Sequence, residues 1–274
     1  MEYITTFRTE INPEILFQPK NEEDLMEFLK KVEKFYVIGG GSNVLILKSA
    51  EKTPFLLIKY PYFSKITLKD KFLTAGAGLP ITKFLNFCIK NEIKGFEFLA
   101  GIPGTIGGAT AMNAGFKGKK ISDKILKVKY ATKEGIFEIP KERCKFGYRE
   151  SIFKNTGKVI IEVVFECEKG EKEVIKRMIN EILKERRKKF PLDFPSAGCI
   201  FKNPEDNFAG RLIELAGCKG LSIGDAEVSQ KHANFIINKG KAKAEDIYKL
   251  IQIVKNKVKE KFGIELKEEI VIFK

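Results

Sequence analysis

Apolar side chains recur every three or four residues in several stretches of the chain, which is the spacing of amphipathic helices. In the first stretch, residues 22–33, the apolar face consists of Leu25, Phe28, Leu29 and Val32, and Asn21 precedes it as a helix cap. The expected helices are residues 22–33, a segment opened by Pro80, residues 171–189, a segment near 208–216 and a segment whose apolar stripe runs from Ile247 to Val258.

Shorter apolar runs between these helices predict strands. Residues 127–132 and 136–139 flank a turn at 133–135 and indicate a hairpin, and residues 159–165 are apolar enough for a central strand. The other expected extended segments are residues 35–38, 55–58, 72–74, 197–202, 235–238 and 270–273. Since the chain shows neither a repeat nor a Pro/Ser-rich linker, any domains must pack closely or share strands.

The composition narrows the class of protein. Of the 274 residues, 43% are hydrophobic and 31% charged, which is typical of a globular chain and excludes disorder as its main state. The start lacks a basic head followed by a long apolar run, and no window approaches about 18 consecutive apolar residues, so we expect neither secretion nor membrane spanning. Five scattered cysteines without a C-x-x-C pair indicate reduced thiols in a cytoplasm.

The charge balance indicates anionic ligands. Fifty Lys and Arg against 36 Asp and Glu give a formal net charge of +14, which suits polyanions and phosphorylated small molecules alike. The basic run at residues 186–189 permits a nucleic-acid patch, but it ends an amphipathic helix, where cations complement the helix dipole. We therefore expect no nucleic-acid partner.

A run of small residues, Gly39-Gly40-Gly41-Ser42-Asn43, directly follows the strand expected at 35–38. Such a run leaves backbone N–H groups accessible and lets a diphosphate approach, so a nucleotide cradle is one interpretation. A tight structural turn is the other. The run matches neither Gly-x-x-x-x-Gly-Lys-Ser/Thr nor Gly-x-Gly-x-x-Gly, which argues against a kinase-type phosphate loop and a Rossmann fingerprint.

A second cluster of small residues, GIPGTIGGATAMNAG, runs from Gly101 to Gly115. A glycine inside a regular element costs about 0.5–1 kcal/mol, so this density predicts a backbone that a ligand approaches closely. Two such loops in one chain strengthen the nucleotide interpretation.

Four motifs follow one another along the chain: GGGSNVL, GIPGTIGGATAMNAG, FGYRESIFK and SAGCIFKNP. In this order they resemble the UDP-N-acetylenolpyruvoylglucosamine reductase family (UDP-N-acetylmuramate dehydrogenases), flavoenzymes that complete UDP-N-acetylmuramate for the bacterial cell wall. The resemblance extends from Thr6 to Phe273. The length and the direct passage into SAGCIFKNP are similar to the short, type II form.

The resemblance implies an α+β fold: a two-subdomain FAD-binding part of the PCMH type, similar to vanillyl-alcohol oxidase, and a C-terminal α+β substrate-binding domain. The implied boundaries are 1–62 with the C-terminal strand 262–274 for the first FAD subdomain, 63–190 for the second and 191–261 for the substrate domain. FAD is expected to be noncovalent, because the single histidine, His232, is distant in sequence from both glycine runs.

By the same resemblance, the first glycine run binds the FAD pyrophosphate and the second lies beside the isoalloxazine and ribityl chain. The implied cofactor-binding residues are Gly39, Gly40, Gly41, Ser42, Asn43, Gly78, Thr105, Gly107, Gly108 and Asn113. NADPH is the implied co-substrate.

Reduction of an enolpyruvyl ether needs a cation or acid for the developing enediolate and a proton donor for the adjacent carbon. The resemblance assigns the first task to Arg149 and Glu269. It assigns the second to Cys199, at a position where most relatives carry serine. Because a thiol, with a pKa of about 8.5, is a stronger acid than a hydroxyl, we expect an active enzyme.

Each of these assignments has an alternative. Arg149 can be a surface charge, and Cys199 can be a small residue that only fills the serine space. Glu268 is the alternative to Glu269, since successive residues of a strand point to opposite sides and the register decides which one faces the site.

Tyr148, Lys202 and Asn203 are the expected substrate-binding residues, and residues 225–238 resemble the substrate domain of the family. His232 is expected to be structural, and since no zinc-ligand spacing occurs, we expect no metal. The expected partners of this cytoplasmic chain are a UDP-linked enolpyruvyl sugar and NADPH, without membrane, and a monomer is expected. The alternatives are an FAD-dependent alcohol or sugar oxidase of the same fold, or a catalytically silent nucleotide-binding homologue.

Overall fold

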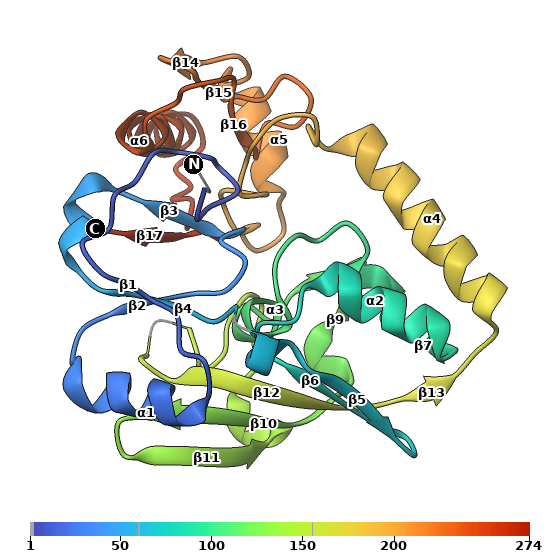
Figure 1. The fold of residues 1–274 in the computed structure, drawn as a ribbon. Helices are drawn as coiled ribbons and strands as arrows, with labels where there is room; N and C mark the ends of the chain where they lie inside the picture. Colours follow the sequence, from blue (N-terminus) through green and yellow to red (C-terminus); the bar gives the residue numbers. More distant parts are fainter. Residues whose placement is uncertain (1–2, 60, 155) are drawn as a thin grey trace. The chain divides into compact units, whose positions relative to one another are not determined.

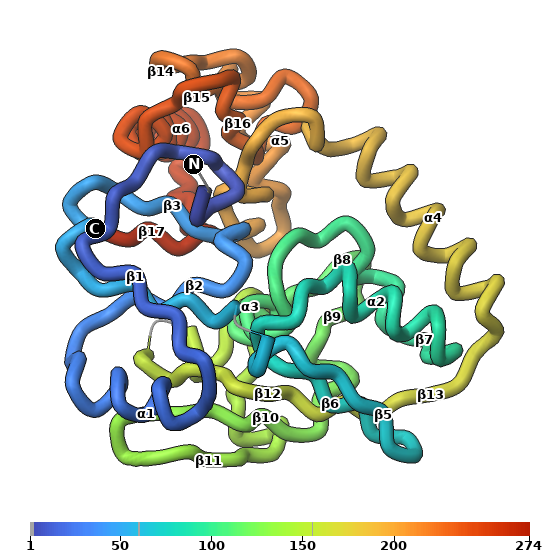
Figure 2. Tube along the Cα trace, viewed as in Figure 1, coloured from blue at the N-terminus to red at the C-terminus, as the bar shows by residue number. Residues whose placement is uncertain are grey.

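A computed structural model describes residues 3–59, 61–154 and 156–274. The chain forms two compact units, each with its own hydrophobic core. The central unit consists of Glu14–Gly40 and the described residues of Thr53–Glu185. The terminal unit consists of residues 3–13, Gly41–Lys52 and Arg186–Lys274. Figure 2 traces how the chain passes through both units. The three-part boundaries expected from the sequence stay a prediction, since these units group the segments in another way.

The main element of the central unit is a five-stranded antiparallel sheet with the strand order β11-β10-β12-β6-β5 (Figure 1). Its strands are β5 (Ile66–Lys69), β6 (Phe72–Gly76), β10 (Ile125–Thr132), β11 (Gly135–Pro140) and β12 (Val159–Glu166). The pairing of β10 with β11 confirms the predicted hairpin, and β12 is the central strand that its apolar sequence predicts.

A small parallel sheet and three helices complete the core of this unit. The sheet has the order β1-β4-β2, with β1 (Leu16–Phe17), β2 (Tyr36–Ile38) and β4 (Phe55–Leu57). The helices are α1 (Glu22–Lys31), α2 (Ile81–Lys90) and α3 (Ile106–Ala111). In α1, the Asn21 side chain accepts a hydrogen bond from the Asp24 amide at 2.8 Å, and Leu25, Phe28 and Leu29 are buried, which confirms the predicted cap and apolar face.

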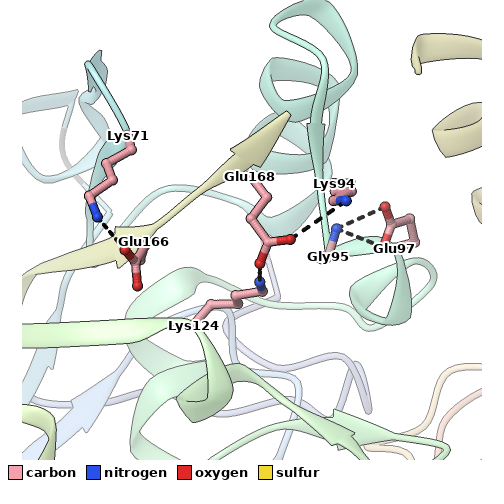
Figure 3. A network of polar contacts seen from close by, with 7 residues as sticks. All are labelled: Lys71, Lys94, Gly95, Glu97, Lys124, Glu166 and Glu168. Atoms are coloured by element: carbon pink, nitrogen blue, oxygen red, sulfur yellow. Dashed lines mark hydrogen bonds and ion pairs between the residues drawn. The ribbon is translucent and has the colours of Figure 1, made fainter. Parts of the chain in front are cut away.

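Short paired strands also belong to the central unit. β7 (Ile93–Lys94) pairs with β13 (Glu168–Lys169), just before the long helix α4 (Lys172–Lys189), and β8 (Gly115–Phe116) pairs with β9 (Lys119–Lys120). Figure 3 shows that Glu168 forms ion pairs with Lys94, at 3.6 Å, and with Lys124, while the buried Glu97 accepts two hydrogen bonds from the Gly95 amide. Exposed ion pairs contribute only about 0–1 kcal/mol each, so these contacts mainly fix the local geometry.

The terminal unit packs helix α6 (Ala244–Phe262) against short strands and helix α5 (Ala209–Leu215). Its strands are β3 (Val44–Ile46), β14 (Ser222–Ile223), β15 (Ala226–Val228), β16 (Ile236–Asn238) and β17 (Val271–Phe273). β3 and β17 pair in parallel, and β14-β15-β16 form an antiparallel sheet. The predicted apolar stripe of α6 from Ile247 to Val258 is buried, and the helix ends at Gly263 with φ 69°.

Residues 197–202 do not form the regular strand that the sequence predicts. A single bridge joins Phe201 to Glu268, and the rest of the segment is irregular. Gly198, with φ +76°, interrupts the extended conformation immediately before Cys199.

Helices long and apolar enough to cross a bilayer are absent from the ranges 3–59, 61–154 and 156–274.

Candidate active site

The two glycine runs meet inside the central unit. A Cβ on Gly40 would lie 2.4 Å from Gly104 Cα, and a Cβ on Gly39 would lie 2.6 Å from Thr105 Oγ1. Gly104 has φ +118°, which a side chain would strain. The tight packing of backbone on backbone therefore explains part of the glycine content without a ligand.

The second cluster is not one continuous loop, because residues Ile106–Ala111 form α3. Thr105 caps this helix, and its Oγ1 accepts a hydrogen bond from the Gly108 amide at 3.3 Å. The Gly107 amide donates to the Ala77 carbonyl at 2.8 Å, and a Cβ on Gly107 would lie 2.7 Å from Ala77 Cβ. A Cβ on Gly108 would meet only an ordinary contact at 3.6 Å among the described atoms. Packing thus explains why position 107 is a glycine. At position 108, no contact among the described atoms requires a glycine.

A cleft of about 580 Å³ opens where these loops meet. Its lining residues, all in the central unit, are Gly40, Lys59, Pro61, Ser64, Gly78, Pro80, Lys83, Gly104 and Thr105. Its size falls within the roughly 300–1,000 Å³ typical of cofactor and ligand sites.

The chemistry of the cleft suits a diphosphate. Gly40, Gly78 and Gly104 present backbone without side chains, while Lys59 and Lys83 bring positive charge. Pro80 gives α2 no side-chain cap, and the positive end of a helix dipole attracts anions. The residues present therefore fit the pyrophosphate of FAD. The two lysines were not found from the sequence, since their spacing matches no phosphate-binding motif.

Asn113 and Arg149 lie close together on two strained turns of the central unit. Asn113 has φ +43° and Arg149 φ +58°, the left-handed region that non-glycine residues rarely adopt. The Asn113 side chain donates to the Gly147 carbonyl at 2.9 Å and accepts from the Ser122 amide at 3.3 Å. These contacts join the turn that carries Arg149 to the end of the glycine cluster.

The Arg149 guanidinium is held in place by the same turns. It donates to the carbonyls of Gly115, at 3.2 Å, and Asn113, at 3.5 Å, and its carbon lies 5.3 Å from the centre of the Tyr148 ring. Arg149 is half-buried and Tyr148 is 55% exposed. A guanidinium oriented by the carbonyls of Gly115 and Asn113 is suited to a planar carboxylate.

In the terminal unit, the segment after Cys199 runs beside the segment that carries Glu269. The Glu269 amide donates to the Ile200 carbonyl at 2.7 Å, and the Lys202 amide donates to the Lys267 carbonyl at 2.9 Å. Cys199 and Glu269 stand in distant parts of the sequence, and the structure joins the residue after Cys199 to Glu269 by a backbone hydrogen bond.

The structure shows what the side chain of Glu268 contacts, which bears on the choice between Glu268 and Glu269. Glu268 forms an ion pair with Lys255 of α6 at 2.9 Å, in a partly buried position. Glu269 lies at a bend that follows the Phe201–Glu268 bridge and precedes β17. The ion pair with Lys255 gives Glu268 a structural partner, and the role of Glu269 toward a substrate stays a prediction.

Other predicted site residues have contacts within the terminal unit. The Asn43 side chain donates to the Glu269 carbonyl at 3.2 Å, so Asn43 contacts the backbone of the candidate glutamate itself. Asn203 Oδ1 accepts from the Ala209 amide at 3.0 Å and thereby caps α5. Gly41, with φ +64°, lies so close to Ile4 that a Cβ would be 2.0 Å from its carbonyl oxygen. Contacts of these residues with a cofactor or substrate stay predictions.

His232 packs against two aromatic rings of the terminal unit that also stack on each other. Its ring centre is 5.3 Å from that of Phe190 and 5.2 Å from that of Phe235. Burial, together with the charge of Lys219, lowers the pKa of His232 below its ordinary value of 6.5. This environment is typical of a structural, neutral histidine.

Two family models match successive parts of the chain. Residues 13–139 match the model described as an FAD binding domain, and residues 190–273 match the C-terminal domain of UDP-N-acetylenolpyruvoylglucosamine reductase. With the observed mixture of helices and sheets, these matches confirm the expected α+β fold of an FAD-binding part followed by a C-terminal domain.

The chain is also similar to individual members of that enzyme family over nearly its whole length. It is 39% identical to UDP-N-acetylenolpyruvoylglucosamine reductase of Clostridium tetani, over 99% of this chain and 90% of the relative. It is 40% identical to the same enzyme of Fervidobacterium nodosum, over 93% of this chain and 84% of the relative. The crystal structure of the enzyme from Thermus caldophilus superimposes with a TM-score of 0.85 at 32% identity, covering 99% of this chain and 96% of that one.

Proposed function

The chain belongs to the UDP-N-acetylenolpyruvoylglucosamine reductase family, and on that premise we propose that it reduces UDP-N-acetylglucosamine enolpyruvate to UDP-N-acetylmuramate, with FAD as cofactor and NADPH as reductant. The observation that carries this proposal is the 39% identity over 99% of the chain, which spans both the FAD-binding part and the C-terminal domain.

FAD is held without a covalent bond. Its pyrophosphate would bind in the cleft of the central unit, where Gly40, Gly78 and Gly104 would admit the phosphates and Lys59 and Lys83 would neutralise their charge. Gly108, whose missing side chain the protein's own packing does not require, would face the cofactor. When bound, FAD would supply hydride-transfer chemistry between NADPH and the methylene carbon of the enolpyruvyl group.

Addition at the methylene carbon leaves negative charge on the adjacent carbon, which spreads into the substrate carboxylate. Arg149 binds this carboxylate with two parallel hydrogen bonds, for which its rigid turn orients the guanidinium. Glu269 stabilises the enolic form of the intermediate, and Cys199 donates the proton that completes the reduction. Tyr148, Lys202 and Asn203 contribute to substrate binding.

The setting of the reaction is the cytoplasm, where UDP-sugars and NADPH are the small-molecule partners of a monomeric chain. The FAD-binding part corresponds to residues 1–62 with 262–274 and to residues 63–190, and residues 191–261 form the substrate-binding domain. Because NADPH and the UDP-sugar are both anionic, the net charge of +14 favours their encounter with the protein without any nucleic-acid partner.

An absorbance experiment tests the proposal. The purified protein should be yellow, lose its flavin absorbance on anaerobic addition of NADPH and regain it when UDP-N-acetylglucosamine enolpyruvate is added. A colourless protein after reconstitution with FAD would overturn the proposal. Bleaching without recovery would favour a catalytically silent homologue, and oxygen consumption with alcohols or sugars would favour an oxidase.

A further inference from the structure

Asn234 is a buried polar residue in the turn before β16, with 3% of its surface exposed. Its side-chain Oδ1 accepts a hydrogen bond from the Phe201 amide at 2.9 Å, and its Nδ2 donates to the Phe201 carbonyl at 2.8 Å. Its own carbonyl accepts from the Ile200 amide at 2.9 Å. Three hydrogen bonds thus join one asparagine to the two residues that follow Cys199.

The Glu268–Glu269 backbone lies on one side of residues 200–201. On the other side, the hydrogen bonds of Asn234 take the place of those that a neighbouring strand would make. A carboxamide carries the same donor and acceptor as a peptide group, so the Asn234 side chain can pair with Phe201 as a neighbouring strand would. On the Glu268–Glu269 side, the Ile200 carbonyl accepts from the Glu269 amide at 2.7 Å. All four backbone polar groups of Ile200 and Phe201 therefore have partners, as buried peptide groups require.

The geometry points to Asn234 as a positioning residue for proton transfer, an inference that rests on the proposed function. By holding the Ile200–Phe201 peptides against the Glu269 segment, Asn234 fixes the backbone of Cys199 relative to that of Glu269. Without the carboxamide, the N–H and C=O of the buried Phe201 lose their partners, and the segment must rearrange to satisfy them.

The two half-reactions separate this role from a general structural role. Reduction of the flavin by NADPH needs no proton from Cys199, whereas reduction of the substrate does. We expect Asn234→Ala to slow the anaerobic reoxidation of reduced flavin by UDP-N-acetylglucosamine enolpyruvate about tenfold or more. The rate of flavin reduction by NADPH should stay within about twofold of the wild-type rate, because this half-reaction does not depend on the position of Cys199.

Asn238, the last residue of β16, offers a matched control four positions further along the chain. It is 1% exposed, and its side chain also makes hydrogen bonds to backbone, donating to the Phe7 carbonyl at 2.8 Å and accepting from the amides of Gly240 and Ala242. Asn238→Ala removes an equally buried carboxamide without touching the Cys199 segment through its side chain. It should lower the thermal midpoint as Asn234→Ala does, while leaving the ratio of the two half-reaction rates unchanged.

A conservative variant and a second readout keep the test decisive if the alanine variant fails to fold. Asn234→Asp keeps an acceptor for the Phe201 amide but offers the Phe201 carbonyl no donor when ionised, so its half-reaction ratio should lie between wild type and Asn234→Ala. Hydrogen exchange of the peptide containing Ile200 and Phe201 should accelerate in both Asn234 variants and not in Asn238→Ala.

Equal slowing of both half-reactions in the Asn234 variants, or no slowing of either, would overturn the inference. So would unchanged hydrogen exchange at Ile200 and Phe201. If instead the wild-type protein is neither bleached by NADPH nor reoxidised by the substrate, the proposed function fails, and the exchange measurement still reports on the Asn234 contacts alone.

Discussion

Cys199 is the residue whose chemistry departs most from the family pattern, because the resemblance predicts serine at its position. If the thiol donates the proton, Cys199→Ala should slow reoxidation of the flavin by the enolpyruvyl substrate by about 10²–10⁴-fold, the usual contribution of a general acid. Flavin reduction by NADPH should be unaffected, because it needs no proton from this residue. Stopped-flow absorbance under anaerobic conditions measures both rates.

Cys199→Ser is the matched control for that variant. It keeps a proton donor of nearly the same size, so it should retain far more of the substrate half-reaction than Cys199→Ala does. A loss of less than about tenfold in Cys199→Ala would assign the thiol a space-filling role instead, since one general acid is worth more than that.

His232 permits a direct test of the electrostatics around its aromatic neighbours. Burial lowers its pKa below 6.5, so the unfolded chain binds the proton first as the pH falls. The stabilising contribution of neutral His232 is therefore complete above pH 6.5 and is lost as the pH decreases below that value. Because the chain has a single histidine, its imidazole gives one NMR signal, whose titration midpoint should lie below 6.5 in the folded protein.

The control for this titration is the same signal in urea, which should have its midpoint near the ordinary value of about 6.5. A folded-state midpoint at or above that of the unfolded chain would contradict the packing of His232 against Phe190 and Phe235.

Helix α3 contains one glycine that packing requires, Gly107, and one that packing does not require, Gly108. Alanine at position 107 would force its Cβ against Ala77, an overpacking that typically costs about 1–3 kcal/mol and exceeds the about 0.5–1 kcal/mol gained in helix propensity. Gly107→Ala should therefore lower the free energy of unfolding of the FAD-free protein. Chemical denaturation measures it.

Gly108→Ala is the complementary variant on the same helix. Its Cβ has room in the protein, so the FAD-free form should be about 0.5–1 kcal/mol more stable than wild type. If the backbone at Gly108 faces FAD, the same methyl group should weaken FAD binding, which fluorescence titration detects. Unchanged FAD affinity would show that this glycine does not contact the cofactor.

The elements that the sequence predicted are those whose apolar pattern lies within one segment, down to the three-residue strands β2, β4, β16 and β17. The periodic helices α1, α4 and α6 and the hairpin of β10 and β11 follow from side chains that repeat along one segment. Helix α3 was missed because its glycines give no apolar period and carry low helix propensity. Its position also depends on the contact of Gly107 with Ala77, which lies in a distant part of the chain and which no local pattern contains.

The sequence predicted mainly those residues of the candidate site that belong to its motifs. The glycine runs, Arg149, Cys199 and Glu269 stand in recognisable segments, but the contribution of Lys59 and Lys83 to the cleft requires the folded loops. The carboxamide of Asn234 pairs with Phe201, which lies 33 positions earlier in the chain, and only the folded backbone brings the two residues together.

For the whole molecule, the net charge of +14 predicts a salt-dependent encounter with both anionic substrates. Raising the ionic strength from about 0.01 M to about 0.15 M shortens the Debye length from about 30 Å to about 8 Å. We expect kcat/KM for NADPH to fall several-fold over this range while kcat changes little, since screening weakens the encounter and not the chemistry. Steady-state kinetics at constant pH measure both constants.

A kcat/KM that is insensitive to salt would contradict steering by the surplus positive charge. Potassium chloride and tetramethylammonium chloride at equal ionic strength form the control pair, because screening acts equally with both and a specific cation effect does not.

The pairing of β3 with β17 has a consequence for synthesis of the protein on the ribosome. β3 (Val44–Ile46) emerges early, yet its partner β17 (Val271–Phe273) is translated last among the described strands. All segments of the central unit have emerged once Glu185 has left the exit tunnel, so this unit can fold on the nascent chain. β3 must wait without its partner until β17 has emerged, and an unpaired strand edge of this kind can pair with other chains during that interval.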